Sequence, residues 1–424
     1  MLVEDPKRSY GRVSDESSRL IWGDNLAAMK TLAPDLSEKI RCIYVDPPYN
    51  TGNDFGDYQD SVDHDEWLSE MRARFEQMRA LLRPDGVLFV QLDDEECAYC
   101  KVLLDEIFGR KNFLNQIAVM VKRVAGASGG GEDRRLKKNL EYILIYTKDA
   151  AKFQRFNPIF EESDLLSHIQ GMESAGRSWK YVSVLGDEGK AVEHRTLRDG
   201  SGGRIEVARH AGVRRTTVAA LTKRAPIDAV YRTHLARIFA DTNAQSSIRT
   251  RIIDSFGQLG RDEMLVARYT PRSGRSRGEQ VVHHYVSPSI RRVIWLSAIT
   301  TERGGRLIKR EQLGTFWNGF DWNNVSKEGA VTFPGKKPEA LLARIIRLAT
   351  DENDWVLDAF GGSGTTAAVA HKLRRRFILI ERGRQAITHA LPRLRRVIDG
   401  TDVNGITAEV GWRGGGGFRF FASR

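Results

Sequence analysis

The chain has 424 residues, of which 41% are hydrophobic and 29% are charged, and this length favours roughly two or three domains. No apolar run approaches the roughly 18 residues of a membrane-spanning helix, and no signal peptide is visible. These features exclude an integral membrane protein and predict a cytoplasmic one. The 66 Lys and Arg residues outnumber the 55 Asp and Glu residues, giving a net charge of +11. This excess fits a nucleic acid as partner, although solubility alone would also explain it.

Strands and helices alternate over the first 149 residues. Residues 40–45 predict a buried strand that stops at Asp46-Pro47-Pro48, because proline cannot continue a ladder. Periodicity predicts helices over 64–82 and 95–108, and strands over 87–92 and 141–146. The alternation predicts an α/β fold with a largely parallel sheet. Residues 125–138 are Gly-rich and then basic, which predicts either a solvated linker or a loop that closes over a substrate.

The alternation is lost between about residues 150 and 330, where arginines multiply, and it then resumes. A helix is expected over 338–350, a strand over 355–360, and a second strand over 376–381 after a Gly-rich turn and a helix. If both α/β pieces form one sheet, the middle is an insertion. The expected domains are therefore 1–149, 150–330 and 331–424.

Within the insertion, residues 204–224 read "RIEVARHAGVRRTTVAALTKR". Ala208, Gly212, Val213 and Val218 fall where a helix-turn-helix motif has small and apolar residues. A basic amphipathic pair of helices used for packing would show the same pattern, so both hypotheses stay open.

Three cysteines, Cys42, Cys97 and Cys100, are too few for a disulfide framework. Cys97 and Cys100 form a C-x-x-C pair, but a structural zinc site needs about four ligands and no second pair is available. We therefore expect no metal site, and interpret the pair as small apolar residues one helical turn apart.

Residues 356–370, "VLDAFGGSGTTAAVA", combine a strand, a Gly-rich turn and a helix opened by Thr365 and Thr366. The glycines let a ligand approach the backbone at the end of the strand, where open α/β sheets bind ligands. Glu381 ends the next strand and could take both hydroxyls of a ribose. No Gly-Lys-Ser/Thr follows, which argues against a triphosphate and favours a nucleoside ligand without phosphates.

The tetrapeptide Asp46-Pro47-Pro48-Tyr49 places an acid, a constrained carbonyl and an aromatic ring at the end of a buried strand. The amino group of adenine is a poor nucleophile because its lone pair is delocalised into the ring. The Asp46 carboxylate and the Pro47 carbonyl could hold its two N–H groups and draw the lone pair toward an electrophile. Tyr49 could stack on the base. Alternatively, the tetrapeptide only ends a strand and leaves a tyrosine on the surface.

Together with F-x-G-x-G at Phe360, Gly362 and Gly364, this tetrapeptide resembles the S-adenosylmethionine-dependent amino-methyltransferases of DNA. The order of the motifs resembles that of the β class. Further blocks resemble the modification (Mod) subunits of type III restriction-modification systems and their solitary relatives: "LIWGDNLAAMKTL", "IYVDPPYNTGNDF", "DGVLFVQLDDEE", "LLDEIFGRKNF", "EYILIYTK", "TNAQSSIRTR", "FPGKKPEALL" and "GGGGFRFF". These blocks reach nearly from end to end and spare mainly residues 150–240.

The resemblance implies a Rossmann-like S-adenosylmethionine-dependent methyltransferase fold with an inserted target-recognition domain at 150–330. It implies a site-specific enzyme that flips adenine out of duplex DNA and methylates its N6 amine. The implied catalytic residues are Asp46, Pro47, Pro48 and Tyr49. The implied cofactor-binding residues are Asp24, Asp46, Lys337, Asp358, Phe360, Gly362, Gly364, Thr365 and Glu381. A homodimer and a possible restriction subunit as partner are also implied. Ala359 stands where the family usually has proline, but the loop glycines are intact.

Other activities are excluded or remain open. Methylation of cytosine C5 needs a cysteine nucleophile, usually after proline, and none of the three cysteines follows one. Protein-glutamine methyltransferases carry the Gly-rich motif first, in the opposite order. Methylation of cytosine N4 stays open because the same acceptors fit either amine. A DNA-recognition subunit without its own activity is also open, although the intact Asp46, Tyr49 and Glu381 argue against it.

Overall fold

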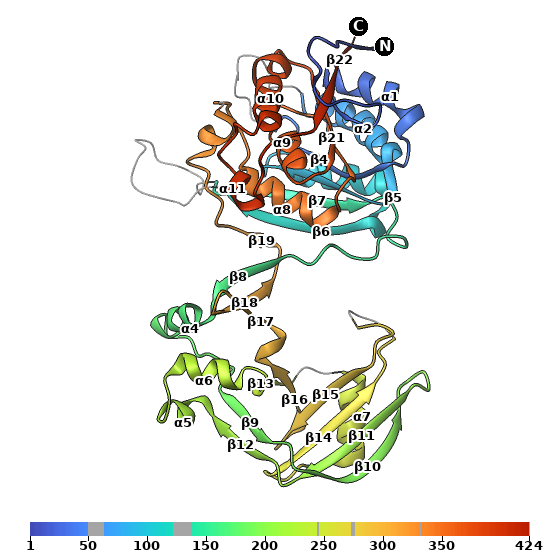
Figure 1. Cartoon of the computed structure of the whole chain (residues 1–424). Helices are drawn as coiled ribbons and strands as arrows, with labels where there is room; N and C mark the ends of the chain where they lie inside the picture. Colours follow the sequence, from blue (N-terminus) through green and yellow to red (C-terminus); the bar gives the residue numbers. More distant parts are fainter. Residues whose placement is uncertain (50–62, 122–137, 244–245, 273–275, 331, 424) are drawn as a thin grey trace, which may run out of the picture. The chain divides into compact units, whose positions relative to one another are not determined.

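The computed structural model describes residues 1–49, 63–121, 138–243, 246–272, 276–330 and 332–423. The chain divides into two compact units, one of residues 1–159 and 313–424 and the other of residues 160–312 (Figure 1). Both ends of the chain therefore build the larger unit, and the second unit is inserted between them. The Gly-rich segment 125–138, expected to be a linker or a closing loop, falls outside the described residues except for Lys138.

The expected boundaries at 150 and 330 differ from those of the structure because the chain packs onto the larger unit on both sides of the insertion. Phe153 and Phe156 pack against its core before the insertion begins. After the insertion, Trp317 is buried in the same core, with Phe320 and Trp322 packed against it. Isolated aromatic residues in an irregular stretch have no period, so the sequence pattern did not assign them to either unit.

A mostly parallel sheet forms the centre of the larger unit. Its strands lie in the order β1, β22, β3, β21, β20, β4, β5, β7, β6 and β19, with β2 paired to β22. Their bounds are β1 Leu2–Glu4, β2 Tyr10–Gly11, β3 Ser18–Trp22, β4 Ile40–Val45, β5 Leu82–Leu92, β6 Phe113–Met120, β7 Leu140–Thr147, β19 Phe316–Trp317, β20 Trp355–Asp358, β21 Arg376–Glu381 and β22 Gly417–Ser423. Neighbours run parallel from β22 through β5, whereas β7 is antiparallel to both β5 and β6.

The strands on the β5 side of the sheet differ in part from the prediction. β6 was not predicted, because Asn115 and Gln116 interrupt its apolar pattern and most of the strand is only half-buried. β6 and β7 are neighbours along the chain and pair antiparallel, so no crossover helix is needed between them. The start of β7 therefore lies at the same edge of the sheet as the end of β5, where Leu92 pairs with Tyr142.

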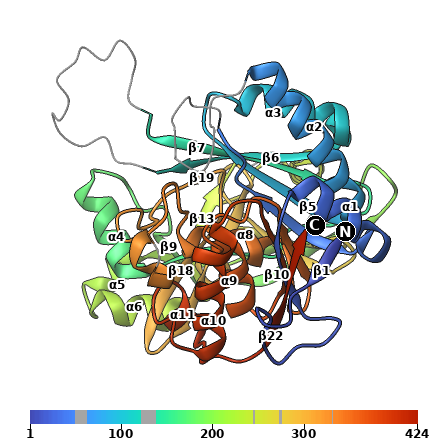
Figure 2. The same cartoon turned by 90° about the horizontal axis from the view of Figure 1, so that it is seen from above.

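Helices cover both faces of this sheet (Figures 1 and 2). One face packs against α1 Asn25–Leu36, α2 His64–Leu81 and α3 Cys97–Leu104, and the other against α8 Glu339–Ala349, α9 Thr365–Lys372 and α10 Leu391–Asp399. A short helix, α11 Thr407–Val410, follows α10. Alternate residues of β4 enter opposite cores: Ile43 and Val45 face α1 and α2, while Tyr44 faces α8. Among the described helices, none is both long and apolar enough to cross a membrane.

β4 and β20 are parallel neighbours although about three hundred residues separate them, with Ile43 paired to Leu357. From β4 the chain passes through α2 to β5 on one side, and from β20 it passes through α9 to β21 on the other. Since α2 and α9 lie on opposite faces of the sheet, β4 and β20 form a topological switch point. Open α/β sheets bind ligands at the carboxyl ends of the strands at such a point.

The second unit is built on an antiparallel sheet in the order β10, β11, β14, β15, β16, β13, β9 and β12, beside a smaller sheet of β17, β18 and β8. The strands are β8 Phe160–Asp164, β9 Ser183–Asp187, β10 Lys190–Arg198, β11 Arg204–Ala211, β12 Arg214–Thr217, β13 Ile238–Thr242, β14 Glu263–Tyr269, β15 Val281–Val286, β16 Arg291–Trp295, β17 Thr300–Arg303 and β18 Arg306–Gln312. The helices are α4 Leu165–Ser174, α5 Val218–Thr222, α6 Ile227–His234 and α7 Ser247–Phe256. α7 covers one face of the larger sheet, where its Phe256 shares a core with Ile205 and Leu265.

Both hypotheses for residues 204–224 are wrong, because this segment forms β11, β12 and the short helix α5. Ile205 and Val207 are buried while Arg204 and Glu206 are exposed. This period of two is that of a strand with one covered face. The small residues that suggested a helix-turn-helix lie in β11 and in the turn after it.

Candidate active site

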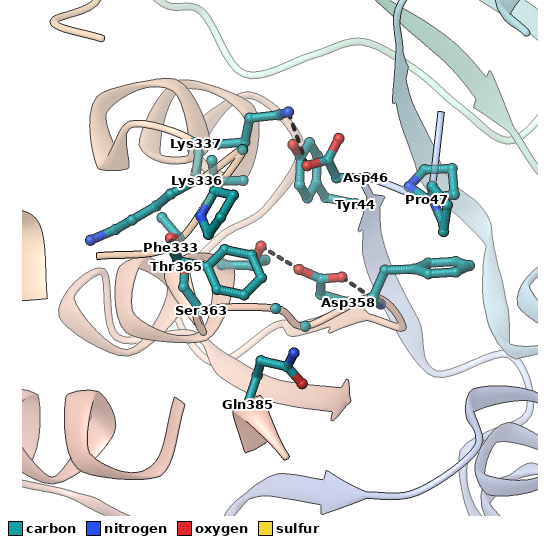
Figure 3. A pocket seen from close by; sticks show the side chains of 18 of the residues that line it. Tyr44, Asp46, Pro47, Phe333, Lys336, Lys337, Asp358, Ser363, Thr365 and Gln385 are labelled. Carbon is teal, nitrogen blue, oxygen red and sulfur yellow. Dashed lines mark hydrogen bonds and ion pairs between the residues drawn. The ribbon is translucent and has the colours of Figure 1, made fainter. Parts of the chain in front are cut away.

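A cavity of about 370 Å³ opens at the carboxyl ends of β4 and β20, within the larger unit (Figure 3). Both pieces of that unit line it, through Tyr44, Asp46, Pro47, Pro48, Tyr49, Glu141, Phe333, Pro334, Gly335, Lys336, Lys337, Leu342, Asp358, Phe360, Gly361, Gly362, Ser363, Thr365, Thr366 and Gln385. The Asp-Pro-Pro-Tyr turn and the Gly-rich turn therefore face the same space.

Four side chains in this cavity, Asp46, Tyr49, Glu141 and Lys337, form what we call the Asp46 cluster. Lys337 Nζ lies 3.0 Å from Asp46 Oδ2 and 3.3 Å from Glu141 Oε2, and it donates to the Tyr49 hydroxyl at 2.9 Å. In Figure 3 the ammonium group of Lys337 points at the Asp46 carboxylate. The Tyr49 hydroxyl is 2.5 Å from Asp46 Oδ1 and 3.1 Å from Glu141 Oε2. Two carboxylates thus share one ammonium group and one phenol.

Neighbouring elements hold this cluster in place. Trp67 of α2 donates its indole N–H to the Pro48 carbonyl at 2.9 Å, which fixes the turn after β4. Gln91 of β5 donates to Glu141 Oε2 at 2.5 Å and accepts from the Tyr44 hydroxyl at 2.8 Å. Glu141 can reach Gln91 because β7 is antiparallel and begins at the edge where β4 and β5 end.

Burial and neighbouring charges act against each other within the Asp46 cluster. Burial raises the pKa of Asp46, and the opposing effect of Lys337 does not cancel it. Burial also favours the neutral form of Glu141, but Lys337 and Gln91 outweigh it, so the pKa of Glu141 is lowered. Burial disfavours the Lys337 ammonium, yet Asp46 and Glu141 outweigh it and raise the pKa of Lys337. With both carboxylates ionised, the cluster carries one net negative charge.

Asp358 ends β20 and organises the first half of the Gly-rich turn. Its Oδ1 accepts the Phe360 backbone N–H at 2.9 Å, and its Oδ2 accepts the Thr366 hydroxyl at 2.5 Å. Burial raises the pKa of Asp358 to about 7, against the lowering effect of these two hydrogen bonds. This carboxyl group therefore titrates near neutral pH.

Glu381 organises the second half of the same turn from the end of β21. Its Oε2 accepts the Gly362 N–H at 2.7 Å and its Oε1 accepts the Gly383 N–H at 2.6 Å. Gly364, just before α9, has a φ of +81°, and a Cβ there would lie 3.1 Å from Ala390. Glycine is needed at that position for both the left-handed backbone and the close packing.

The structure brings most of the predicted site residues together. The residues that line the cavity are Asp46, Pro47, Pro48, Tyr49, Lys337, Asp358, Phe360, Gly362 and Thr365. The predicted residues that do not line it are Asp24, Gly364 and Glu381. Asp24 caps α1, and the next residue, Asn25, donates to the Ala359 carbonyl of the Gly-rich turn at 2.9 Å. The roles assigned to all these residues remain predictions.

Sequence reasoning missed several residues of the cavity, among them Tyr44, Glu141, Phe333 and Gln385. Glu141 was seen only as the first residue of a strand, and its place depends on the direction of β7. Tyr44 lies inside β4, where the sequence does not say which face a side chain takes. A charged residue at the start of a buried strand, as Glu141 is, was the one signal available.

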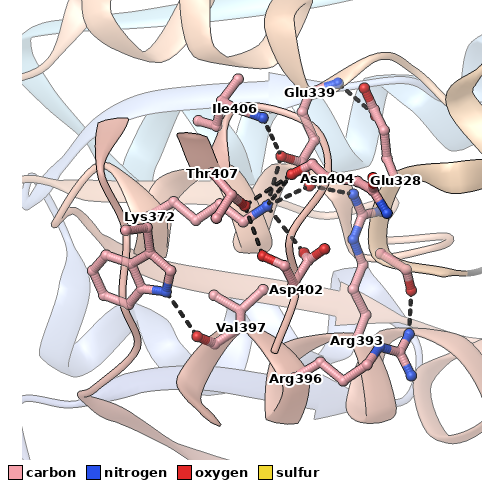
Figure 4. A network of polar contacts seen from close by, with 12 residues as sticks. Glu328, Glu339, Lys372, Arg393, Arg396, Val397, Asp402, Asn404, Ile406 and Thr407 are labelled. Atoms are coloured by element: carbon pink, nitrogen blue, oxygen red, sulfur yellow. Dashed lines mark hydrogen bonds and ion pairs between the residues drawn. The ribbon is translucent and has the colours of Figure 1, made fainter. Parts of the chain in front are cut away.

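A buried ionic network links the cavity wall to three helices (Figure 4). Arg393 of α10 donates to the Thr365 hydroxyl at 2.7 Å and to Glu339 Oε1 of α8 at 2.8 Å. Lys372 of α9 donates to both Glu339 oxygens at 3.0 and 2.8 Å and lies 3.0 Å from Asp402. The side chains of Glu339, Lys372 and Arg393 are 0% exposed. The network thus ties Thr365, on the cavity wall, to the packing of α8, α9 and α10.

A doubly wound sheet whose switch point opens into a cavity is a Rossmann-like architecture, and this is the class of the fold. Within that class, the chain belongs to the N6/N4 DNA methylase family, whose profile matches residues 40–391. The fold class and the family resemblance predicted from the sequence are confirmed.

Two curated relatives and one solved structure are similar to this chain. The chain is 37% identical over 424 residues to the "Probable type III restriction-modification enzyme HindVI Mod subunit" of Haemophilus influenzae, covering 98% of this chain and 56% of that protein. It is 26% identical over 376 residues to the StyLTI Mod subunit of Salmonella typhimurium, covering 82% and 48%. The chain thus spans about half the length of these curated relatives. The solved PvuII DNA methyltransferase (cytosine-N4-specific) is 12% identical, with coverages of 93% and 90% and a TM-score of 0.42.

Proposed function

We propose that the chain is a site-specific DNA methyltransferase that transfers the methyl group of S-adenosylmethionine to the N6 amine of adenine in duplex DNA. The observation that carries this proposal is the shared cavity, in which Asp46 and the Gly-rich turn face one another. Family membership and the likeness to type III Mod subunits support it. By the same likeness, a restriction subunit is the proposed partner, and a homodimer stays a prediction.

The residues of the cavity fit S-adenosylmethionine, which supplies an electrophilic methyl group on a positively charged sulfur. Phe333 and Phe360 offer apolar surface to an adenine ring, and the Gly362 backbone is open to close approach. The carboxyl groups of Asp46 and Asp358 favour a positive charge beside them. We propose that these residues hold the cofactor with Lys337 and Thr365, while Gly364, Glu381 and Asp24 maintain the turn that contacts it.

The opposite wall of the cavity suits the amino group of a base. We propose that the Asp46 carboxylate and the Pro47 carbonyl accept its two N–H groups, while Tyr49 stacks on the ring. Asp46 would accept the proton that the amine nitrogen loses as it takes the methyl group, which S-adenosylmethionine would supply with its sulfur as the leaving group. The base must first leave the duplex, at a cost of roughly a few kcal/mol.

A methyl-transfer assay with sequencing of the modified bases tests this function. Duplex DNA incubated with the full chain and labelled S-adenosylmethionine should gain N6-methyladenine within one short fixed sequence. N4-methylcytosine in place of N6-methyladenine would assign the alternative family activity. DNA binding without any methyl transfer would make the chain a recognition subunit, and either result would overturn the proposal.

The inserted unit carries most of the net positive charge of the chain. Residues 160–312 hold 26 Lys and Arg against 17 Asp and Glu, a net charge of +9 out of +11 for the whole chain. Arginines exposed on its strands include Arg198, Arg204, Arg214 and Arg268. Such a surface suits the phosphates of DNA, because each neutralised phosphate releases a counterion. We propose that this unit contacts DNA and sets the target sequence.

Exchanging the inserted unit tests that assignment. Replacing residues 160–312 with the corresponding segment of a relative that has another target should move methylation to the relative's sequence. The affinity for S-adenosylmethionine should stay unchanged, because the whole cavity belongs to the larger unit. Direct sequencing of modified bases would report which DNA sequence is methylated, and an unchanged methylated sequence would refute the assignment.

A further inference from the structure

Glu141 belongs to the cavity but to neither of the two motifs that the proposed function uses. We propose that Glu141 is a positioning residue for methyl transfer, which pairs with Lys337 so that Lys337 does not cancel the negative charge that Asp46 offers to the incoming amino group. This inference rests on the proposed function and deepens it.

Glu141 is fixed independently of Lys337. Its side chain is 16% exposed, and its Oε2 accepts from Gln91 Nε2 at 2.5 Å and from the Tyr49 hydroxyl at 3.1 Å. The Gln91 amide oxygen in turn accepts from the Tyr44 hydroxyl, so this amide is held in one orientation. The carboxylate therefore stays in place, on a strand framework, whether or not the ammonium group of Lys337 remains beside it.

The charges of the Asp46 cluster explain why a second carboxylate is needed. If Asp46 were the one carboxylate beside it, the largely buried ammonium group of Lys337, 3.0 Å away, would form an ion pair with Asp46 that has no net charge. With Glu141 at 3.3 Å from the same ammonium, the cluster keeps one net negative charge. The attacking nitrogen becomes more positive during the transfer, so a net negative cluster stabilises the transition state and a neutral one does not.

Glu141 also gives Lys337 a second acceptor. Lys337 now donates to the Tyr49 hydroxyl and lies against Asp46 Oδ2, the oxygen that an N–H group of the base would need. When a base takes that oxygen, the ammonium group can keep its contact with Glu141 and stay paired. Without Glu141, releasing Asp46 would leave a buried ammonium group without a carboxylate, which is costly.

The titration of the cluster agrees with this arrangement. Burial raises the pKa of Asp46 and the negative charge of Glu141 raises it further, against Lys337 and Tyr49. Asp358, Tyr44 and Lys336 are the other titratable groups among the described residues that line this cavity. Removing the charge of Glu141 should therefore lower the pKa of Asp46, because Lys337 would then act on Asp46 alone.

Charge removal at Glu141 and at Lys337, separately and together, tests the inference. Glu141→Gln keeps the shape and should lower the single-turnover methyl-transfer rate about 100-fold, with little change in the affinity for S-adenosylmethionine or DNA. Glu141→Asp keeps the charge and should restore most of the rate. Glu141→Gln in a Lys337→Met background should cost no more than about twofold further, since no ammonium remains to be neutralised. The matched control is Glu106→Gln, an exposed carboxylate paired with Arg72.

Two results would overturn the inference: a rate of Glu141→Gln within twofold of the parent, or losses that multiply fully in the double variant. A readout without activity separates this inference from the proposed function. The full chain is labelled with ¹³C at its aspartate carboxyl groups and titrated by NMR, and the Asp46 signal is assigned as the one missing in Asp46→Asn. The pKa of Asp46 should be lower in Glu141→Gln than in the parent chain. An inactive parent chain with this shift would sink only the proposed function. An active parent chain with no shift would sink only the inference.

Discussion

Replacing Asp46 with alanine should lower methyl transfer about 1,000-fold while lowering the affinity for S-adenosylmethionine far less, because the other residues proposed to hold the cofactor remain. The variant removes the carboxylate that we propose holds and deprotonates the amino group, but Glu141 remains to pair with Lys337. The backbone N–H groups of the Gly-rich turn also keep their hydrogen bonds to the carboxyl groups of Asp358 and Glu381. Single-turnover transfer of labelled methyl groups and calorimetric titration of the cofactor measure the two quantities.

Asp35→Ala, in an exposed position on α1, is the matched control and should transfer at the parent rate. A rate for Asp46→Ala within tenfold of the parent would contradict the assigned role. The parent enzyme should also lose activity on acidification, since Asp46 accepts a proton only when it is ionised. Because burial raises the pKa of Asp46, this loss should begin at a higher pH than for an ordinary aspartate.

Replacing Glu339 with alanine should lower the free energy of unfolding of the larger unit by about 3–5 kcal/mol. Glu339 is fully buried and pairs with both Lys372 and Arg393, so its loss removes the carboxylate that Arg393 pairs with and leaves Lys372 beside Asp402. The backbone N–H of Ile406 also loses its acceptor. Urea unfolding, followed through the transition of the larger unit, measures the change.

Glu409→Ala is the control for that experiment. Glu409 pairs with Arg347 on the surface of the same unit, with 56% of its side chain exposed, so the unfolding free energy should not change measurably. A loss below about 1 kcal/mol for Glu339→Ala would show that Lys372 and Arg393 are satisfied by other groups. Because Arg393 donates to Thr365, cofactor affinity should fall together with stability.

The two motifs of the site could be predicted because each lies where a strand ends. β4 and β20 are parallel, and the carboxyl ends of parallel strands meet at one edge of a sheet. The positions of Asp46 and Asp358 in the site can therefore be predicted from that rule and from the local sequence alone. Glu141 does not, because a residue at the start of a strand reaches that edge only if the strand runs antiparallel, as β7 does.

The ionic network and the inserted unit could not be predicted for a different reason. Lys372 and Arg393 are charged residues on short helices, and sequence pattern places such residues in solvent. They are buried because α8, α9 and α10 pack against one another around Glu339. In β11, only four residues show the alternation of a strand, and the small residues at helix-turn-helix positions outweighed them in the prediction. The pairing of β11 with β10 and β14 decides in favour of the strand.

The pairing of β4 with β20 also has a consequence for synthesis on the ribosome. The Asp-Pro-Pro-Tyr turn emerges early, but the strand beside it and the wall formed by 333–337 emerge only after the whole inserted unit. The inserted unit has its own cores and can fold first, while β4, which pairs with β5 on one side, gains its second neighbour β20 only about three hundred residues later. A nascent chain of this protein can therefore fold the inserted unit before the cavity at the ends of β4 and β20 is complete.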